Sequence, residues 1–283
     1  MDVLRTTCSL LACFDAESSN SREANLRRAI TLTAQFPTIL TAFHRLRQGQ
    51  ELIPPHSTLS HAGNFLYTLT GREPDSYHER VMDAALVLHA DHEFNASTFS
   101  ALVTGSTLSD IYSAVTSGIG TLKGPLHGGA NEAVLRQIDE IVSVERVQEY
   151  VEQALVQKKK VIGFGHRMYK TYDPRARIFK EYARKLAELS GEDRFFRINE
   201  RLEATMVQQV GGKGIYPNID LYSGIVYRHL GIPRDIFTPI FAMARVAGWT
   251  AHLLEYWQEN RLFRPVAIYN GPAPRKYVPL DSR

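Results

Sequence analysis

Apolar residues recur at helical spacing along most of this chain, and this periodicity constrains the fold more than any other feature. In residues 25–36 they stand three and four positions apart, as on the buried face of an amphipathic helix. Pro37 is expected to break or kink this helix before another helical stretch that runs toward Arg47. Because alternating strand patterns are scarce, the sequence predicts an all-α fold. Similar helical patterns cover residues 77–89, 98–118, 130–138, 144–158, 173–190, 195–209, 221–229 and 238–258, whereas residues 20–22 and 48–57 resemble loops.

Composition excludes several classes of protein. The chain has 283 residues, of which 44% are hydrophobic and 22% charged, enough for one sizeable core or two smaller ones. The net charge of +3 is small and the basic residues are scattered, except at 158–160, so nucleic-acid binding is not indicated. No apolar run reaches membrane-spanning length and no signal-peptide pattern is visible, which favours a cytoplasmic protein. Cys8 and Cys13 lie in a Leu-rich stretch and are expected to be buried rather than to form a disulfide or metal site.

Three turns place a titratable side chain beside Gly or Pro where a helical pattern breaks. They are residues 124–131 with His127, residues 163–167 with His166, and residues 216–220 with Asp220. Such breaks are where a rigid scaffold can present a group to a small ligand. Two imidazoles and a carboxylate presented in this way suggest proton transfer next to a carbonyl.

His127 precedes a helical pattern, so we expect it at a helix N-terminus. The positive end of the helix dipole disfavours an imidazolium there and leaves a neutral ring that can polarise a carbonyl oxygen. His127 is therefore a candidate electrophile, and the alternative is a histidine that caps a buried turn.

The segment after His166 carries Arg167, Lys170 and Arg175 and resembles an anion site, although it can also be a solvated basic loop. Its glycines are too few for a dinucleotide fingerprint. Asp220 stands among apolar residues, where it is either a general base of raised pKa or an N-cap, and the sequence favours neither. No third ligand follows His89 and His92 at a zinc-site spacing, so we expect no metal.

The same motifs resemble those of the bacterial citrate synthases, in the same order along the chain. They are residues 91–98, 124–131, 163–175 and 216–220, and the resemblance continues through 241–249 and 260–265. It implies a two-domain helical fold with the active site in the cleft between a large domain (1–128 and 225–283) and a small domain (129–224). In this family a substantial N-terminal segment precedes the part that resembles residues 1–5. We expect its absence here to affect folding, oligomerisation and regulation.

The resemblance also implies a reaction, the condensation of acetyl-CoA with oxaloacetate and water to give citrate and CoA, with no metal or prosthetic group. Asp220 would take a proton from the acetyl methyl group, His127 would donate a hydrogen bond to the thioester oxygen, and His166 would polarise the keto group of oxaloacetate. A homodimer is expected, with Arg264 reaching into the site of the second subunit. The remaining residues implied are His92, Asn95, Arg175, Phe241 and Arg245 with Arg264 for oxaloacetate, and Val161, Gly163, Gly165 and Lys170 for CoA.

Two alternatives stay open at this point. One is a 2-methylcitrate synthase that uses propanoyl-CoA, because one methylene changes binding by only about 1–3 kcal/mol. The other is a truncated, non-catalytic protein that dimerises or binds a ligand.

Overall fold

The computed structural model describes all 283 residues, and its regular secondary structure consists of helices, which confirms the all-α prediction. The only β contact is an isolated antiparallel bridge between Phe164 and Pro217. None of the helices is both long and apolar enough to cross a membrane. The α-helices are α1 (Asp2–Leu11), α2 (Arg22–Arg47), α3 (His61–Thr70), α4 (Ser76–Ala90), α5 (Ala96–Ser106), α6 (Ile111–Leu122), α7 (Ala130–Ile141), α8 (Val147–Val156), α9 (Pro174–Ser190), α10 (Arg194–Val210), α11 (Asp220–His229) and α12 (Phe237–Tyr256).

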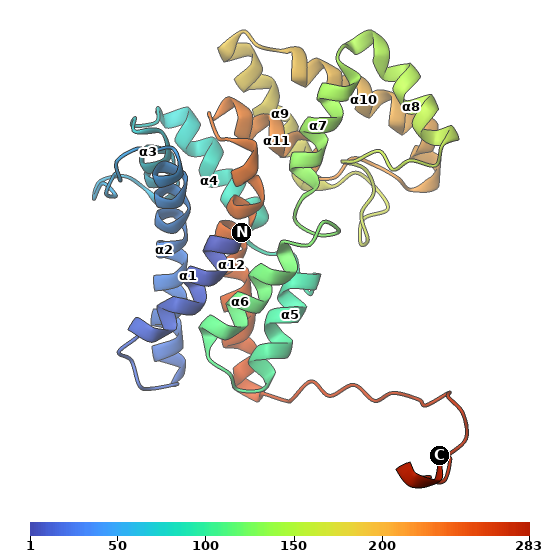
Figure 1. Cartoon of the computed structure of the whole chain (residues 1–283). Coiled ribbons are helices and arrows are strands. Elements are labelled where there is room, and N and C mark those ends of the chain that lie inside the picture. The colour runs from blue at the N-terminus through green and yellow to red at the C-terminus, as the bar shows by residue number, and fades with distance from the viewer.

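The helices form two groups (Figure 1). Helix α12 packs against α2, α4, α5 and α6, and α1 packs against α2 and α6. Helix α11 packs against α7 and α9, and α10 packs against α8. The two groups meet where α12 contacts α7 and where α4 contacts α9. The division at residues 128 and 224 stays a prediction, and its second boundary falls inside α11.

Several predictions about individual helices are wrong. The pattern at 98–118 is two helices, because the chain turns at Leu108, whose φ is 63°, and Asp110 then caps α6. Helices α1 and α3 were not anticipated. Pro37 lies inside the continuous helix α2, so the expected break is wrong, while the expected kink stays a prediction. Cys13 is exposed, since it lies beyond the last turn of α1, whereas Cys8 is buried as expected.

Local capping fixes where many helices begin. A Ser, Asp or Asn side chain accepts a backbone N–H of the first turn, which would otherwise lack a partner. The residues that do this are Ser21, Ser60, Asp75, Asn95, Asp110 and Asp173, at the starts of α2, α3, α4, α5, α6 and α9.

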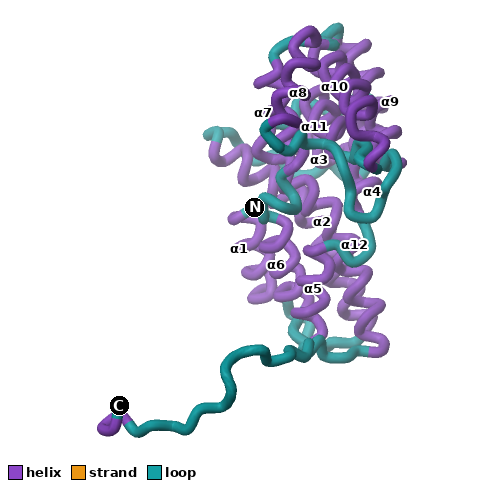
Figure 2. The backbone as a smooth tube through the Cα atoms, turned by 90° about the vertical axis from the view of Figure 1, so that its right-hand side faces the viewer, coloured by secondary structure: helices purple, strands orange, loops and turns teal.

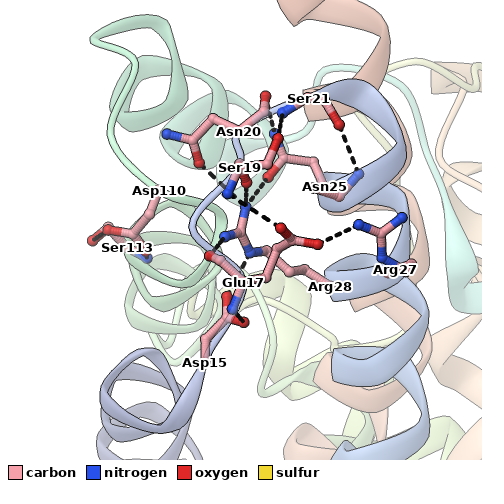
Figure 3. Close-up of polar contacts among 11 residues, drawn as sticks. Asp15, Glu17, Ser19, Asn20, Ser21, Asn25, Arg27, Arg28, Asp110 and Ser113 are labelled. Carbon is pink, nitrogen blue, oxygen red and sulfur yellow. Dashed lines mark hydrogen bonds and ion pairs between the residues drawn. The ribbon is translucent and has the colours of Figure 1, made fainter.

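A buried arginine fastens the connection between α1 and α2 (Figure 3). Arg28 on α2 donates from Nε to Asp15 Oδ2 at 2.5 Å and from Nη1 to Asn25 Oδ1 at 2.9 Å. It also binds the backbone carbonyls of Glu17 and Ser19 and the side chain of Asn20. We call this set of contacts the Arg28 latch, and it holds a loop that has few apolar residues of its own.

The chain ends in an extended segment that runs away from the helices (Figures 1 and 2). Phe263 is the last residue that packs against the helices: its N–H donates to Ser106 Oγ at 3.1 Å and its ring stacks on Tyr256. Residues 264–283 are all exposed.

Candidate active site

Two loops that carry predicted catalytic residues lie side by side. The Gly165 N–H donates to the Tyr216 carbonyl at 2.8 Å, and the Asn218 N–H donates to the Gly163 carbonyl at 2.9 Å. Asn218 Nδ2 also donates to the Gly165 carbonyl at 2.9 Å. These contacts bring the loop of His166 against the loop that leads into Asp220.

His127 is partly buried on the turn between α6 and α7. The Ser97 N–H donates to its Nε2 at 3.3 Å, and Ser97 Oγ lies 2.9 Å from the same atom. An Nε2 that accepts a hydrogen bond assigns the proton to Nδ1, which then has no partner within the chain. Burial, and secondarily Arg245, lowers the pKa of His127 to about 4. The ring is therefore neutral at physiological pH with a free N–H donor.

Helix α7 begins at Ala130 with Gly129 as its N-cap, so His127 lies just before the N-terminus of the helix, as the sequence predicts. The causes of its lowered pKa are burial and, second, the charge of Arg245. The glycine that follows His127 is needed for close packing, since a Cβ on Gly128 would lie 2.3 Å from the carbonyl oxygen of Leu122.

Asp220 is the first residue of α11, and its carboxylate does not cap the helix. Its backbone N–H donates a hydrogen bond to Asn218 Oδ1 at 3.1 Å. Burial raises the pKa of Asp220 to about 6, with Arg175 acting to lower it and Asp173 to raise it. Of the two possibilities that the sequence left open, the general base of raised pKa therefore fits the structure.

His166 and His92 lie ring to ring, with their centroids 4.9 Å apart. His166 Nδ1 accepts the N–H groups of Met168 and Tyr169 at 3.1 and 3.3 Å, which assigns the proton of a neutral ring to Nε2. Burial, then the neighbouring His92 and Arg175, holds the pKa of His166 below its usual value. Nε2 of His92 is buried and has no partner within the chain.

Two arginines face this cluster with part of each guanidinium free. Arg175 donates hydrogen bonds from Nε and Nη2 to the carboxylate of Asp173, at 3.1 and 2.8 Å, and its Nη1 has no partner within the chain. Arg245 is 1% exposed, donates from Nε to the His89 carbonyl at 2.8 Å and lies 4.8 Å above the ring of Phe241. Burial lowers the pKa of Arg245 to about 10, so it stays charged at neutral pH. The hydrogen-bond partner of Arg245 within the chain is thus a backbone carbonyl and not a carboxylate.

Of the other predicted oxaloacetate residues, Phe241 and Asn95 lie at or beside the site and Arg264 lies away from it. Phe241 lies at the site, with its ring centroid 6.2 Å from that of His127. Asn95 caps α5 and binds Ser97 Oγ at 2.8 Å, so it supports the His127 contact. Arg264 is exposed on the extended segment and binds only the Pro265 carbonyl, so it does not enter the site of its own chain.

The predicted CoA segment is tightly packed. Val161 is buried, and a Cβ on Gly163 would lie 2.9 Å from Leu221 Cδ1. The Gly163 carbonyl and the Gly165 N–H are used between the two loops, while Lys170 is exposed. Of these four residues, Lys170 therefore has the freest polar group.

Residues 1–266 match the family described as citrate synthase, C-terminal domain. The chain belongs to the citrate synthase family. It is 50% identical over 286 residues to the citrate synthase of Deinococcus radiodurans, covering 100% of this chain and 75% of that enzyme. It is 43% identical to the 2-methylcitrate synthase of Shewanella oneidensis, covering 100% of this chain and 74% of that enzyme.

A solved structure supports the same assignment. The citrate synthase of Thermoplasma acidophilum, in a ternary complex with carboxymethyl coenzyme A and oxaloacetate, superposes with a TM-score of 0.91 at 40% identity. The match covers 99% of this chain and 75% of that one. The family predicted from the motifs is confirmed.

Sequence reasoning missed two residues of this candidate site. Ser97 contacts both His127 and the indole Nε1 of Trp249, which donates to Ser97 Oγ at 3.1 Å. Asp173 binds Arg175 and is 1% exposed. Both residues stand inside motifs that were recognised, at 91–98 and 163–175, and that position was the only available signal.

Proposed function

We propose that this chain is a citrate synthase, which joins the acetyl group of acetyl-CoA to oxaloacetate and releases citrate and CoA. One observation carries the proposal. The site combines a neutral His127 that has a free Nδ1–H with an Asp220 carboxyl of raised pKa. It also contains two arginines, Arg175 and Arg245, that keep N–H groups free to bind a ligand. Membership of the citrate synthase family supports the same reaction.

In the first step, the Asp220 carboxylate takes a proton from the methyl group of acetyl-CoA. The pKa of about 6 makes it a stronger base than an ordinary carboxylate while it remains ionised at neutral pH. His127 Nδ1 donates a hydrogen bond to the thioester oxygen, where negative charge develops as the C–H bond breaks. The Ser97 N–H donates to the other ring nitrogen, Nε2, and so holds His127 in the tautomer that this step needs.

In the second step, the methylene carbon of the enolate attacks the keto carbon of oxaloacetate and forms a C–C bond. His166 Nε2–H stabilises the developing alkoxide and gives it a proton, so the keto oxygen becomes the hydroxyl of the citryl thioester. Water then attacks the thioester carbonyl and the C–S bond breaks. Of the two protons that the water loses, one returns to His166 Nε2 and one goes to the CoA sulfur, while Asp220 releases the methyl proton to solvent, and citrate and CoA leave. No redox change occurs in this sequence.

Oxaloacetate carries two carboxylates, and Arg175 and Arg245 supply matching cations. Nη1 of Arg175 and both Nη atoms of Arg245 make no hydrogen bond within the chain. His92 adds its unpartnered Nε2, and Phe241 supplies an apolar wall beside His127. For CoA, Lys170 is the side chain best placed to bind a phosphate, with the backbone of the 161–165 loop beside it.

The proposal is tested by mixing purified protein with acetyl-CoA and oxaloacetate and following free CoA thiol with a thiol-reactive chromophore. We expect thiol release only when both substrates are present. Asp220→Asn should abolish release and leave oxaloacetate affinity, measured by calorimetry, nearly unchanged. A folded wild-type chain that releases no thiol would instead support the non-catalytic alternative.

A second candidate reaction is supported by the 43% identity to a 2-methylcitrate synthase, which covers the whole chain. The two reactions share every step and differ only in the donor, because propanoyl-CoA has one more methylene. A competition assay with equal acetyl-CoA and propanoyl-CoA decides between them. A higher kcat/KM for propanoyl-CoA would overturn the acetyl assignment.

We also propose that the active unit is a homodimer in which Arg264 completes the site of the partner chain. Its position on an extended, exposed segment beyond Phe263 supports this, since such a segment can cross a twofold interface reciprocally. Mixing inactive Arg264→Ala and Asp220→Asn chains should restore some activity, because a heterodimer then holds one intact site. No recovery, with chain exchange shown independently, would place Arg264 outside the shared site. A cytoplasmic location also stays a prediction.

A further inference from the structure

The buried carboxylate of Asp173 binds two parts of the active site, Arg175 and the backbone that leads into Asp220. Asp173 lies immediately before α9, and its side chain is 1% exposed. Its Oδ1 accepts the backbone N–H and the Nε–H of Arg175, at 3.0 and 3.1 Å. Its Oδ2 accepts Nη2 of Arg175 at 2.8 Å and the backbone N–H of Ile219 at 3.2 Å.

These contacts join two elements that are distant in sequence. Ile219 immediately precedes Asp220 at the start of α11, so one carboxylate holds the N-terminal ends of both α9 and α11. The Asp173 N–H also donates to the Pro217 carbonyl at 3.2 Å. The backbone that carries Asp220 and the guanidinium of Arg175 are therefore fixed to the same group.

The charges around Asp220 give this contact a second effect. Arg175 is the cation that acts on Asp220, and a cation near a carboxylate lowers its pKa and weakens it as a base. Asp173 acts on Asp220 in the opposite direction. Tyr227, on α11 itself, keeps its proton because burial and the charge of Asp220 raise its pKa. His89, on the neighbouring α4, stays neutral because burial lowers its pKa to about 3.

We propose that Asp173 is a positioning residue that couples the oxaloacetate side of the site to the acetyl-CoA side, holding Arg175 and the Asp220 loop in register and offsetting the charge of Arg175 at Asp220. This inference rests on the proposed function. Arg175 can then serve as an oxaloacetate ligand without making Asp220 too weak a base. A purely structural N-cap has no such effect on proton transfer.

The test is the pH profile of kcat/KM for acetyl-CoA at saturating oxaloacetate. Asp173→Asn keeps the size of the side chain and a good N-cap for α9, but removes the charge. We expect its acid limb to move to lower pH by about one unit, because Arg175 is no longer offset. We expect kcat to fall by about 10²-fold, since the base is weaker and less well placed. Arg175→Gln should move the acid limb in the opposite direction.

Glu203→Gln is the matched control. Glu203 is also a nearly buried carboxylate of this helix group, 13% exposed at its side chain, and it accepts hydrogen bonds from Tyr172 and Tyr222 and pairs with Lys180. It does not act on Asp220. Its loss should lower the thermal midpoint and leave the acid limb in place.

Each outcome decides the inference. An acid limb that does not move in folded Asp173→Asn, or that moves equally in Glu203→Gln, overturns it while wild-type turnover leaves the proposed function intact. A wild-type chain without CoA release removes both. If Asp173→Asn does not fold, Asp173→Ser, which also caps α9, takes its place. If that variant also fails to fold, a shift of the acid limb to higher pH in Arg175→Gln supports the effect of Arg175 on Asp220 that the inference needs, and the absence of this shift overturns the inference.

Discussion

The Arg28 latch predicts a large difference between two neighbouring arginines of α2. Replacing Arg28 with Met removes the partner of Asp15, and the two side chains are only 10% and 16% exposed. Breaking a buried ion pair by removing one partner costs about 3–5 kcal/mol. Water can replace the lost contacts at the exposed Ser19 and Asn20, so we expect the low end, about 3 kcal/mol. This is a factor of roughly 10² in the unfolding equilibrium constant.

Arg27→Met is the control within the same turn of helix (Figure 3). Arg27 pairs with Glu17, but the two side chains are 62% and 30% exposed, and an exposed pair contributes at most about 1 kcal/mol. Urea unfolding of both variants and the wild type, followed by circular dichroism at one protein concentration, measures the difference. Equal midpoints for Arg28→Met and Arg27→Met would refute the reasoning.

The latch also gives stability a dependence on acid pH. Burial acts to raise the pKa of Asp15, but hydrogen bonds from Arg28 and from the Glu17 N–H outweigh it and hold the pKa below its usual value. Because the pKa of Asp15 is lower in the folded chain than in the unfolded chain, the stabilisation by the Asp15–Arg28 ion pair is fully present above about pH 4 and is lost as the pH falls further. The deficit of Arg28→Met relative to wild type should therefore shrink on acidification.

Three further predictions concern the site. Ser97→Ala leaves the buried Trp249 Nε1–H unpaired and removes the Ser97 Oγ contact with His127 Nε2, while the Ser97 N–H stays in place. We expect a loss of about 1–3 kcal/mol in urea unfolding and a lower kcat; an unchanged kcat would show that the Oγ contact with His127 has no part in the reaction. Arg245→Leu should weaken oxaloacetate binding by about 2–5 kcal/mol in calorimetry, and unchanged affinity would exclude it as a ligand. Gly248→Ala places a Cβ 2.2 Å from the last carbonyl oxygen of α4, so its thermal midpoint should fall sharply, whereas Ala at Gly120, which has open space, should not lower it by that mechanism.

The helices were predictable where their apolar spacing was regular. Residues 173–190 and 195–209 became α9 and α10 with small shifts at the ends, because the apolar spacing is regular in both and Asp173 also caps α9. The pattern at 98–118 failed because the spacing carries across a turn whose decisive features are a residue at positive φ and a capping Asp110.

The sequence predicted most residues of the candidate site, but not the causes of their pKa shifts or the contacts that support them. His127 was recognised as neutral, but burial and Arg245 lower its pKa, and neither is visible before the chain folds. Ser97 and Asp173 act through partners 30 and 46 residues away, at His127 and Ile219. The neighbouring sequence places both residues at helix starts, which is correct, but it does not show these distant partners.

The bond between Trp249 and Ser97 gives this protein an optical signal of its own. The chain has two tryptophans, and the indole of Trp249 is fully buried with its N–H on Ser97, one contact from His127. The other, Trp257, donates to the Gly105 carbonyl at the far end of α5. Because indole emission responds to the polarity and hydrogen bonding around the ring, any movement of Ser97 on ligand binding is converted into a fluorescence change. A Trp257→Phe chain thus keeps one tryptophan, which contacts the candidate electrophile through Ser97. Excitation that is selective for tryptophan over the 13 tyrosines makes substrate binding observable without a label and without turnover.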